Sequence, residues 1–477
     1  MIGWILLAAV VLLVAVLLVR TALFKPKDET RAAPCEAELD GEHAVESLRQ
    51  MIQCKTVSHV DDTLNDWGEF EKFKKLLKKR YPALHKTCTL EEIGKTGLLY
   101  TWKGKSDKEP SVLMAHYDVV PVNEEQWDKP AFEGVIEDGV LWGRGTLDTK
   151  GTLCGVMESC EKLISDGFTP ENDIYIAFAG DEETAGDTAP SMVKVLEERG
   201  IVPQLVVDEG GAVVEGVFPG VREKCALIGI AEKGMMNLEF KITSTGGHAS
   251  APPPHGPVGK LAQAVVDVEG HPFKARLTEP IAQMFDLLGR RSSFAMRLIF
   301  ANLWLFMPVL NAICKKSGGE LNAMMRTTCA FTQTEASKAA NFLPPQAKLV
   351  ANFRLIGGDT MDSAIEYIRK TIHNDEIELT PLMGMNPCPV SDTKSAGYAK
   401  LKNAIEQTWP DAVVSPYLMV ACSDSRHYTR ISDKVMRFSA MELSKEERGF
   451  IHANNERIPV DKIVTTAQFY HRLVKQL

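Results

Sequence analysis

The sequence has few cysteines and no concentrated block of basic residues. Ten cysteines in 477 residues are too dilute for a disulfide scaffold, and no Cys-x-x-Cys pair is present. The formal net charge of −9 argues against a protein that binds nucleic acid through its phosphates. The chain also lacks an Asn-x-Ser/Thr sequon, an internal repeat and a low-complexity segment. With 45% hydrophobic and 25% charged residues, the composition is that of a globular chain of about two or three domains.

A long apolar segment lies at the N-terminus. Residues 2–19 carry no charge and are nearly all apolar, which is long enough for a helix to cross a bilayer. No basic residue precedes this run, as one usually does in a cleaved signal peptide. The pattern predicts a single-pass membrane anchor over residues 1–24, or a secreted protein if the segment is cleaved, followed by a linker over residues 25–42. The basic residues that follow the run favour a body on the cytoplasmic side.

Strand and helix patterns alternate after the linker. Strands are expected at residues 111–115, 173–179 and 204–207, and helices at residues 151–166 and 191–199. Short apolar strands separated by helices indicate an α/β fold, with a mostly parallel sheet and helices on both faces.

A second pattern begins near residue 230. Its elements follow in the order strand, helix, strand, strand, helix, strand, which predicts a small α+β (βαββαβ) lid domain. The expected division is a catalytic domain formed by residues 43–229 and 386–477, into which a lid or dimerisation domain of residues 230–385 is inserted.

One stretch inside the predicted lid domain is unusually apolar. Residues 298–314 carry no charge and include Phe300, Trp304 and Phe306. They form either a buried or partly buried helix of the lid domain, or an apolar surface that contacts a lipid-like substrate or the membrane. The sequence leaves both interpretations open.

Histidine and carboxylate residues follow several of the predicted strands. They are His116, Asp118, Asp148, Glu182, Glu183, Asp208, Glu209 and His452. Ligands of an open α/β sheet bind beyond the carboxyl ends of the strands, so these side chains are expected to meet there. Imidazole and carboxylate groups suit zinc, and this set would hold two zinc ions that share one carboxylate. Asp118 shares a strand face with His116, where it can hold the second imidazole nitrogen.

Longer motifs surround these residues. They are SVLMAHYDVVPV, LWGRGTLDTKG, GDEETAG, VVDEGG, GGHASAPP and IHANNERIPV. Through these motifs, residues 43–477 resemble the aminoacylase, carboxypeptidase S and succinyl-diaminopimelate desuccinylase family of dinuclear zinc hydrolases. The resemblance is greatest to the branch of N-fatty-acyl-amino-acid synthase/hydrolases and Gly-Xaa carboxypeptidases.

The family resemblance implies which residues bind two Zn²⁺ ions in each subunit. The ligands would be His116 on the first ion, Asp148 between both ions, and Glu183 and His452 on the second ion. Either Asp208 or Glu209 would complete the first site. Neighbours on a strand point to opposite faces, so only one of these two is expected to bind.

The resemblance also implies roles around the substrate. Glu182 would be the general base, and Asp118 would orient His116. His248 would stabilise the oxyanion, and in dimeric relatives this histidine comes from the partner subunit. Arg354 would bind the substrate α-carboxylate, which suits its planar guanidinium. Asn341 would lie near the substrate.

Together these features predict a metal-dependent amidohydrolase or carboxypeptidase. Its substrates would be N-acyl amino acids, including N-fatty-acyl amino acids in a reversible reaction, or short peptides cleaved at the C-terminal residue. The alternative is an inactive, membrane-tethered binding protein on the same fold. The expected partners are a small substrate, a membrane through the N-terminal segment and a second copy through the lid domain, but no nucleic acid. The resemblance favours an extracytoplasmic body, in conflict with the basic residues after the anchor.

Overall fold

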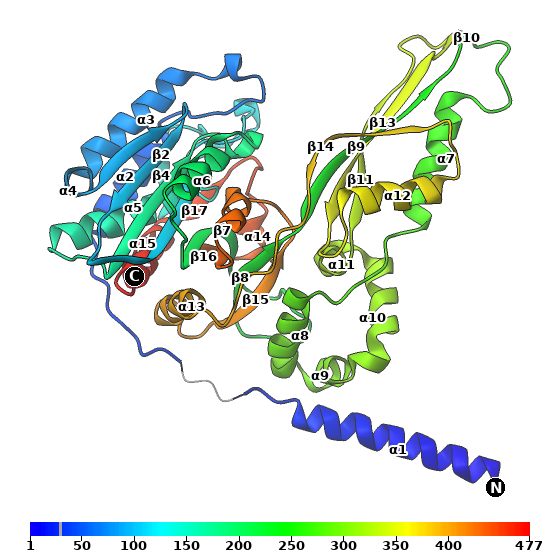
Figure 1. Cartoon of the computed structure of the whole chain (residues 1–477), viewed down its shortest axis with the longest axis horizontal. Helices are drawn as coiled ribbons and strands as arrows, with labels where there is room; N and C mark the ends of the chain where they lie inside the picture. Colours follow the sequence, from blue (N-terminus) through cyan, green and yellow to red (C-terminus); the bar gives the residue numbers. More distant parts are fainter. Residues whose placement is uncertain (28–30) are drawn as a thin grey trace.

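A computed structural model describes residues 1–27 and 31–477, and an eight-stranded sheet forms its centre (Figure 1). The strand order is β1 (Thr89–Ile93), β2 (Gly97–Trp102), β6 (Asn172–Ala179), β3 (Ser106–His116), β7 (Leu205–Val214), β16 (Val435–Leu443), β8 (Cys225–Glu232) and β15 (Val413–Met419). The strands β6, β3, β7 and β16 pair in parallel, as do β8 and β15. The sheet is therefore mostly parallel, as predicted, with antiparallel pairs at β1, β2 and between β16 and β8.

Helices cover both faces of this sheet. On β3, Leu113 and Ala115 belong to the core that contains α5 (Lys150–Ser165) and α15 (Val460–Val474). The intervening Val112 and Met114 belong to a second core with α6 (Thr188–Glu198). Alternate residues of one strand thus enter opposite cores, which explains why the strand reads as a continuous apolar run.

The remaining elements of the large domain surround this sheet. They are α2 (Gly41–Ile52), α3 (Trp67–Arg80), α4 (Pro82–Thr87), β4 (Val135–Glu137), β5 (Val140–Trp142), α13 (Ala396–Thr408), α14 (Lys445–Arg448), β17 (Arg457–Pro459) and four short 3-10 helices, η1 (Asp62–Leu64), η2 (Glu124–Gln126), η3 (Glu182–Thr184) and η4 (Asp424–Arg430). Side chains of Asp40 and Ser395 cap the N-termini of α2 and α13, which satisfies amide groups that the helix itself leaves free.

A separate antiparallel sheet carries the predicted βαββαβ pattern. Its order is β11 (Thr328–Glu335), β13 (Gln346–Leu355), β9 (Gly234–Thr243) and β14 (Glu378–Met385). The helices α7 (Pro257–Gly270) and α12 (Met361–Ile372) bury apolar side chains against it, including Leu261 and Ile368. At its far tip, β10 (Gly247–His248) pairs with β12 (Phe342–Leu343), as Figure 1 shows.

Four helices between α7 and β11 depart from this simple pattern. They are α8 (Glu279–Arg291), α9 (Phe294–Ala301), α10 (Leu303–Ser317) and α11 (Gly319–Met325). α8 packs on β15 of the large sheet, and its Ile281 and Phe285 lie in the large core. The apolar stretch 298–314 lies in α9 and α10 and is partly buried, and its buried Phe300, Leu310 and Cys314 belong to the large core rather than to the core of the small sheet. An amphipathic pattern shows that one face is buried but does not identify the partner.

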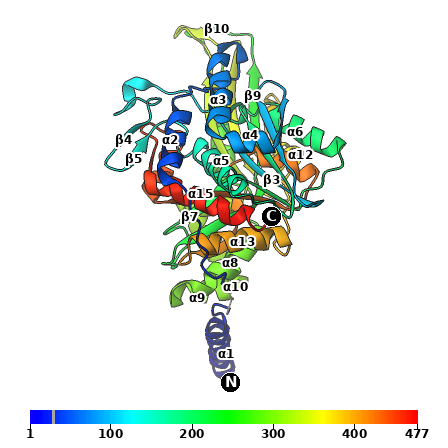
Figure 2. The same cartoon turned by 90° about the vertical axis from the view of Figure 1, so that its left-hand side faces the viewer.

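The N-terminal helix α1 (Ile2–Leu23) extends away from the body beside α9 (Figures 1 and 2). Within the described residues it is the one unbroken helix long and apolar enough to cross a membrane, and its apolar part is exposed. Residues 28–30 of the predicted linker lie outside the described residues.

Candidate metal centre

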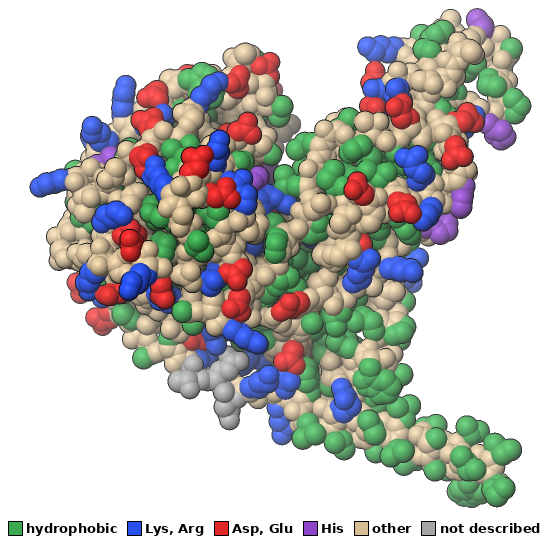
Figure 3. Space-filling view, in the orientation of Figure 1, with side chains coloured by type: hydrophobic (Ala, Val, Ile, Leu, Met, Phe, Trp, Pro, Cys, Tyr) green, Lys and Arg blue, Asp and Glu red, His purple; other side chains and the backbone are tan. Residues whose placement is uncertain are grey.

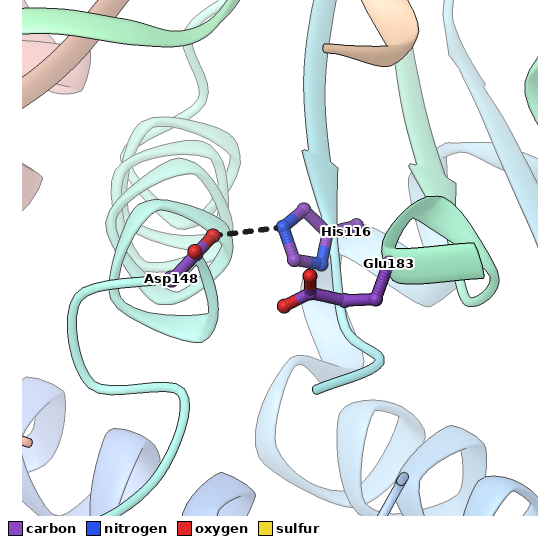
Figure 4. Close-up of side chains that lie close together, drawn as sticks. All are labelled: His116, Asp148 and Glu183. Carbon is purple, nitrogen blue, oxygen red and sulfur yellow. Dashed lines mark hydrogen bonds and ion pairs between the residues drawn. The ribbon is translucent and has the colours of Figure 1, made fainter. Parts of the chain in front are cut away.

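Five of the predicted residues, together with Glu209 of β7, meet near the carboxyl ends of the strands. His116 ends β3, and Glu182 and Glu183 form the turn η3 just after β6. Asp148 precedes α5, and His452 follows α14. Figure 4 shows His116, Asp148 and Glu183 directed toward one another from these separate elements.

Asp148 lies between the two histidines. Its Oδ1 is 3.0 Å from His116 Nε2, and its Oδ2 is 2.9 Å from His452 Nε2. Glu183 Oε2 is 3.0 Å from the same nitrogen of His452. The two oxygens of Asp148 thus face two different imidazoles. A carboxylate that bridges two adjacent metal ions would have this placement.

The centre holds more negative charge than its protein partners neutralise. Burial raises the pKa of the Glu182 carboxyl well above its usual range. Burial and the charge of Asp148 raise the pKa of Glu209 to about 8. Hydrogen bonds to Asp148 and Glu183 raise the pKa of His452 to about 10. Glu183 Oε1 is buried and has no hydrogen-bond partner in the part of the chain that the structure describes. A buried carboxylate needs a partner for its charge, and several carboxylates are crowded together here. Bound divalent cations would supply the missing positive charge.

Asp118 holds several parts of the centre in place. His116 Nδ1 lies 3.1 Å from the Asp118 carbonyl oxygen and 3.3 Å from its carboxylate. The backbone amides of Glu182 and Glu183 donate to the same carboxylate, at 3.2 and 3.1 Å. The Ser58 hydroxyl donates to it at 2.7 Å. Asp118 therefore fixes both the orientation of the His116 imidazole and the position of the turn η3. The sequence had indicated only the first of these two roles.

The structure separates the two adjacent acids on β7. Glu209 Oε1 is 3.6 Å from His116 Nε2, and this residue lines the same cavity as Asp148 and His452. Asp208 is buried and accepts a hydrogen bond from the Ser425 amide. It lines a second, very small cavity that His116 and Glu182 also line. Among the described residues, one of the two groups of close ligand atoms contains Glu209, together with His116 and Glu182, and neither group contains Asp208.

Glu456 was missed by the sequence analysis, although its motif was noted. Its side chain is fully buried and accepts hydrogen bonds from Arg144 (2.7 Å) and from the amides of Gly145 (3.0 Å), Leu147 (2.7 Å) and Asp148 (3.2 Å). A single Glu in a polar loop is usually exposed to solvent, so the local pattern offered no reason to select it. Its partners lie more than 300 positions away along the chain. Glu456 sets the conformation of the loop that presents Asp148.

Replacing Glu456 with Gln is expected to weaken metal binding by about 10- to 100-fold, the usual effect of removing an outer-shell partner. The amide cannot accept hydrogen bonds through both atoms, so one end of the loop loses its partner. Metal titration of the metal-free protein by calorimetry measures the change. The matched control is Glu446→Gln, because Glu446 is exposed. Equal affinities for both variants would contradict the role of Glu456.

The three residues that the sequence predicts for the lid domain lie at different distances from the metal centre. Arg354 on β13 lines the cavity with Asp148 and His452, and its Nε donates to Asn352 Oδ1 at 3.2 Å. His248 and Asn341 lie together at the exposed tip formed by β10 and β12, where the Ala249 amide donates to the Asn341 carbonyl oxygen at 3.1 Å. Within one chain, only Arg354 reaches the centre. Within the described chain, His248 and Asn341 are not among the residues that line this cavity, and their roles near the substrate stay predictions.

Comparison with known proteins identifies the family. The family model described as Peptidase family M20/M25/M40 matches residues 112–476. The chain belongs to this family. Its membership confirms the predicted resemblance, and with it the prediction of a metal-dependent hydrolase.

Relatives and solved structures agree with this assignment. The chain is 36% identical to a probable carboxypeptidase S-like 2 of Dictyostelium discoideum, over 85% of this chain and 79% of the relative. It is 34% identical to the N-fatty-acyl-amino acid synthase/hydrolase PM20D1 of Xenopus tropicalis, over 98% and 93%. The M20 metallo-carboxypeptidase Sso-CP2 of Sulfolobus solfataricus has the same fold, with a TM-score of 0.66, 16% identity and coverage of 91% and 98%. The Bacillus subtilis YXEP protein, a dinuclear metal-binding M20 peptidase, has a TM-score of 0.55, 11% identity and coverage of 91% and 98%.

Proposed function

We propose that this chain hydrolyses the amide bond of N-acyl amino acids, with a long acyl chain as the preferred acyl group, and that it does so with two zinc ions. The main support is an apolar cavity that opens directly from the centre. Relatives of this chain include enzymes that act on N-fatty-acyl amino acids and carboxypeptidases, so short peptides are the alternative substrates.

The cavity has a volume of about 460 Å³, within the range of small-molecule sites. Asp148, Glu182 and His452 lie at its polar end. The side chains that line the rest are mainly apolar, including Val214, Leu227, Tyr417, Met419 and Leu443. Glu320, Arg354 and Arg448 are charged exceptions in this lining. The apolar side chains of the lining offer a surface for the hydrocarbon chain of an N-acyl substrate.

The distances given above support one assignment of the metal ligands. His116 and Glu209 would hold one zinc ion, His452 and Glu183 the other, and Asp148 would bridge them. Nitrogen and oxygen donors of these kinds suit zinc. When bound, the two ions would polarise the scissile carbonyl and lower the pKa of a water to about 7.

Glu182 and Arg354 would act on the substrate itself. Glu182 lines the cavity beside the ligands, so its carboxylate would take the proton from the attacking water and deliver it to the leaving amine nitrogen. Arg354 lines the same cavity, and its guanidinium would bind both oxygens of the α-carboxylate.

The oxyanion donor would come from a second copy of the chain. His248 is exposed at the tip of the small sheet, away from its own centre (Figure 1). The family resemblance assigns this histidine to the partner's active site. We therefore expect a homodimer in which each tip completes the other subunit's centre, with Asn341 beside it.

The N-terminal helix α1 would be a retained membrane anchor, because its apolar part is long enough to span and stays exposed. The side of the membrane on which the body lies stays a prediction. The family resemblance favours the extracytoplasmic side, while Arg20, Lys25 and Lys27 favour the cytoplasm.

Substrate profiling of the zinc-loaded protein tests this function. The kcat/KM for an N-oleoyl amino acid is expected to exceed that for a Gly-Xaa dipeptide, because only the former fills the apolar cavity. The α-carboxamide of the same oleoyl substrate should be turned over about 10- to 100-fold less efficiently, since a charge-assisted hydrogen bond is lost. In the variant Arg354→Lys, the difference in kcat/KM between the carboxylate and the carboxamide substrate should be smaller. Preference for the dipeptide would remove the acyl proposal.

A further inference from the structure

The helices α9 and α10 present a large apolar surface next to the anchor. Their exposed side chains include Phe294 (56% exposed), Trp304 (58%), Leu305 (36%), Val309 (54%) and Ile313 (55%). Figure 3 shows hydrophobic side chains along α1 and on the neighbouring part of the body. A soluble surface rarely exposes so many large apolar side chains side by side, so this face is expected to be covered.

The two helices are too short and too bent to cross a bilayer. They contain 8 and 15 residues, so even α10 is about 22 Å long, less than the hydrocarbon core of about 30 Å. The pair is apolar enough to count as one span but bends by 111° at its break. This geometry suits a shallow hairpin that enters only one leaflet.

The polar groups at the bend are satisfied by the anchor helix. Asn302, at the break, is fully buried. Its amide donates to Leu17 O (3.3 Å) and Thr21 Oγ1 (3.3 Å) of α1. Arg20 of α1 donates to Ala301 O (3.0 Å) and Asn302 Oδ1 (3.1 Å). Inside a membrane, backbone and amide groups must find protein partners, and this bend meets that condition.

The same contacts fix the depth of the hairpin. Leu17, Arg20 and Thr21 belong to the last two turns of α1, so the bend lies at the membrane boundary nearest the body. Arg290 of α8 also contacts the segment after α1, with its guanidinium 4.4 Å from the Phe24 ring centre and a hydrogen bond to Lys25 O (3.1 Å).

Basic side chains flank this apolar segment. In the sequence, Arg290 and Arg291 precede α9, and Lys315 and Lys316 lie in the last turn of α10. Lys27 and Arg290 also pair with Asp286. Arg297 Nε is buried without a hydrogen-bond partner among the described residues. Basic groups at the boundary of an apolar surface are attracted to phosphate headgroups.

We propose that the α9–α10 hairpin is embedded in the leaflet nearest the body, beside α1, and that a lipid bilayer covers its apolar face. The inference rests on the proposal that α1 is a retained anchor. The protein would then contact the membrane at two places, so the body has a fixed orientation rather than hanging from a free tether.

The proposed membrane contact is joined to one wall of the cavity through α11. The cavity that begins at the metal centre includes Glu320 in its lining, and Glu320 belongs to α11, which directly follows α10. One wall of the cavity therefore belongs to the helix that directly follows the proposed membrane contact.

A fluorescent probe on the full-length, zinc-loaded protein tests the hairpin. The protein is reconstituted in vesicles of phosphatidylcholine and phosphatidylserine, and an environment-sensitive dye is attached at Val309→Cys or Ile313→Cys. Lipids with a nitroxide on the acyl chain are expected to quench both probes severalfold. The matched control is Val266→Cys on α7, which is 62% exposed and should be unaffected. Labelling of the parent protein gives the background from its own cysteines.

Equal, weak quenching at Val309, Ile313 and Val266 would overturn the proposal. Unchanged hydrolysis of a water-soluble short-acyl substrate shows that each labelled variant is folded. Because the quenching signal does not depend on catalysis, its loss is distinguishable from a failure of the proposed function, which the substrate profile alone decides.

Discussion

Glu182→Gln should lose about 10²- to 10⁴-fold of kcat while keeping its fold and both metal ions. This is the usual contribution of a positioned general acid and base. The variant keeps the size of the side chain and the backbone amide of residue 182, which donates to Asp118 Oδ1, so the turn η3 should not change. The measurement pairs kcat on an N-oleoyl amino acid with the metal content of the same sample.

The matched control is Glu183→Gln. Glu183 Oε2 faces His452 Nε2 at 3.0 Å, so this neighbouring change should lower metal content as well as activity. If Glu182→Gln kept most of its activity, another group would be the base. If it lost metal instead, Glu182 would be a ligand. A metal-loaded native protein without chelator-sensitive activity would favour the inactive binding protein.

His248→Ala should reduce kcat by about 10²- to 10³-fold, the usual effect of removing one oxyanion donor. The metal content should stay at the native value, because His248 is exposed at the tip of the small sheet and lines no part of the cavity. A loss of this size from so distant a side chain would be explained by a partner subunit. Activity near the native value would show that the centre is complete within one chain.

Co-expression of two inactive variants tests the partner directly. In a dimer of His248→Ala with Glu182→Gln, one of the two centres receives an intact Glu182 and an intact His248. Random pairing makes half of the dimers mixed, so about a quarter of native activity should return if the subunits associate by a two-fold axis. Co-expression of Glu182→Gln with Glu183→Gln is the control and should restore no activity. Each subunit of that mixed dimer carries a change in its own metal centre, so neither centre is intact. Absence of recovery in the first pair would contradict the shared site.

The sequence by itself was enough for the fold class and for the common location of most of the predicted metal ligands. The second half of β3 and most of β6 are apolar because both of their faces are buried. His116 is the last residue of β3, and Glu182 lies three residues after β6. Residues that follow parallel strands must gather at one edge of the sheet. Local pattern therefore identified the ligand types and their common location without any knowledge of distant contacts. The family motifs are short segments of the same kind, so they too could be recognised without knowledge of distant contacts.

The tertiary structure decided what depends on the path of the chain. It distinguished Glu209 from Asp208, whose positions in the sequence are equivalent. It brought Glu456 to the loop of Asp148, and it placed α8 against the large sheet rather than the small one. It also showed His248 at a distant tip and the bend at Asn302 satisfied by α1. A local pattern records which side of an element avoids water, but only the folded chain determines which remote partner meets that side.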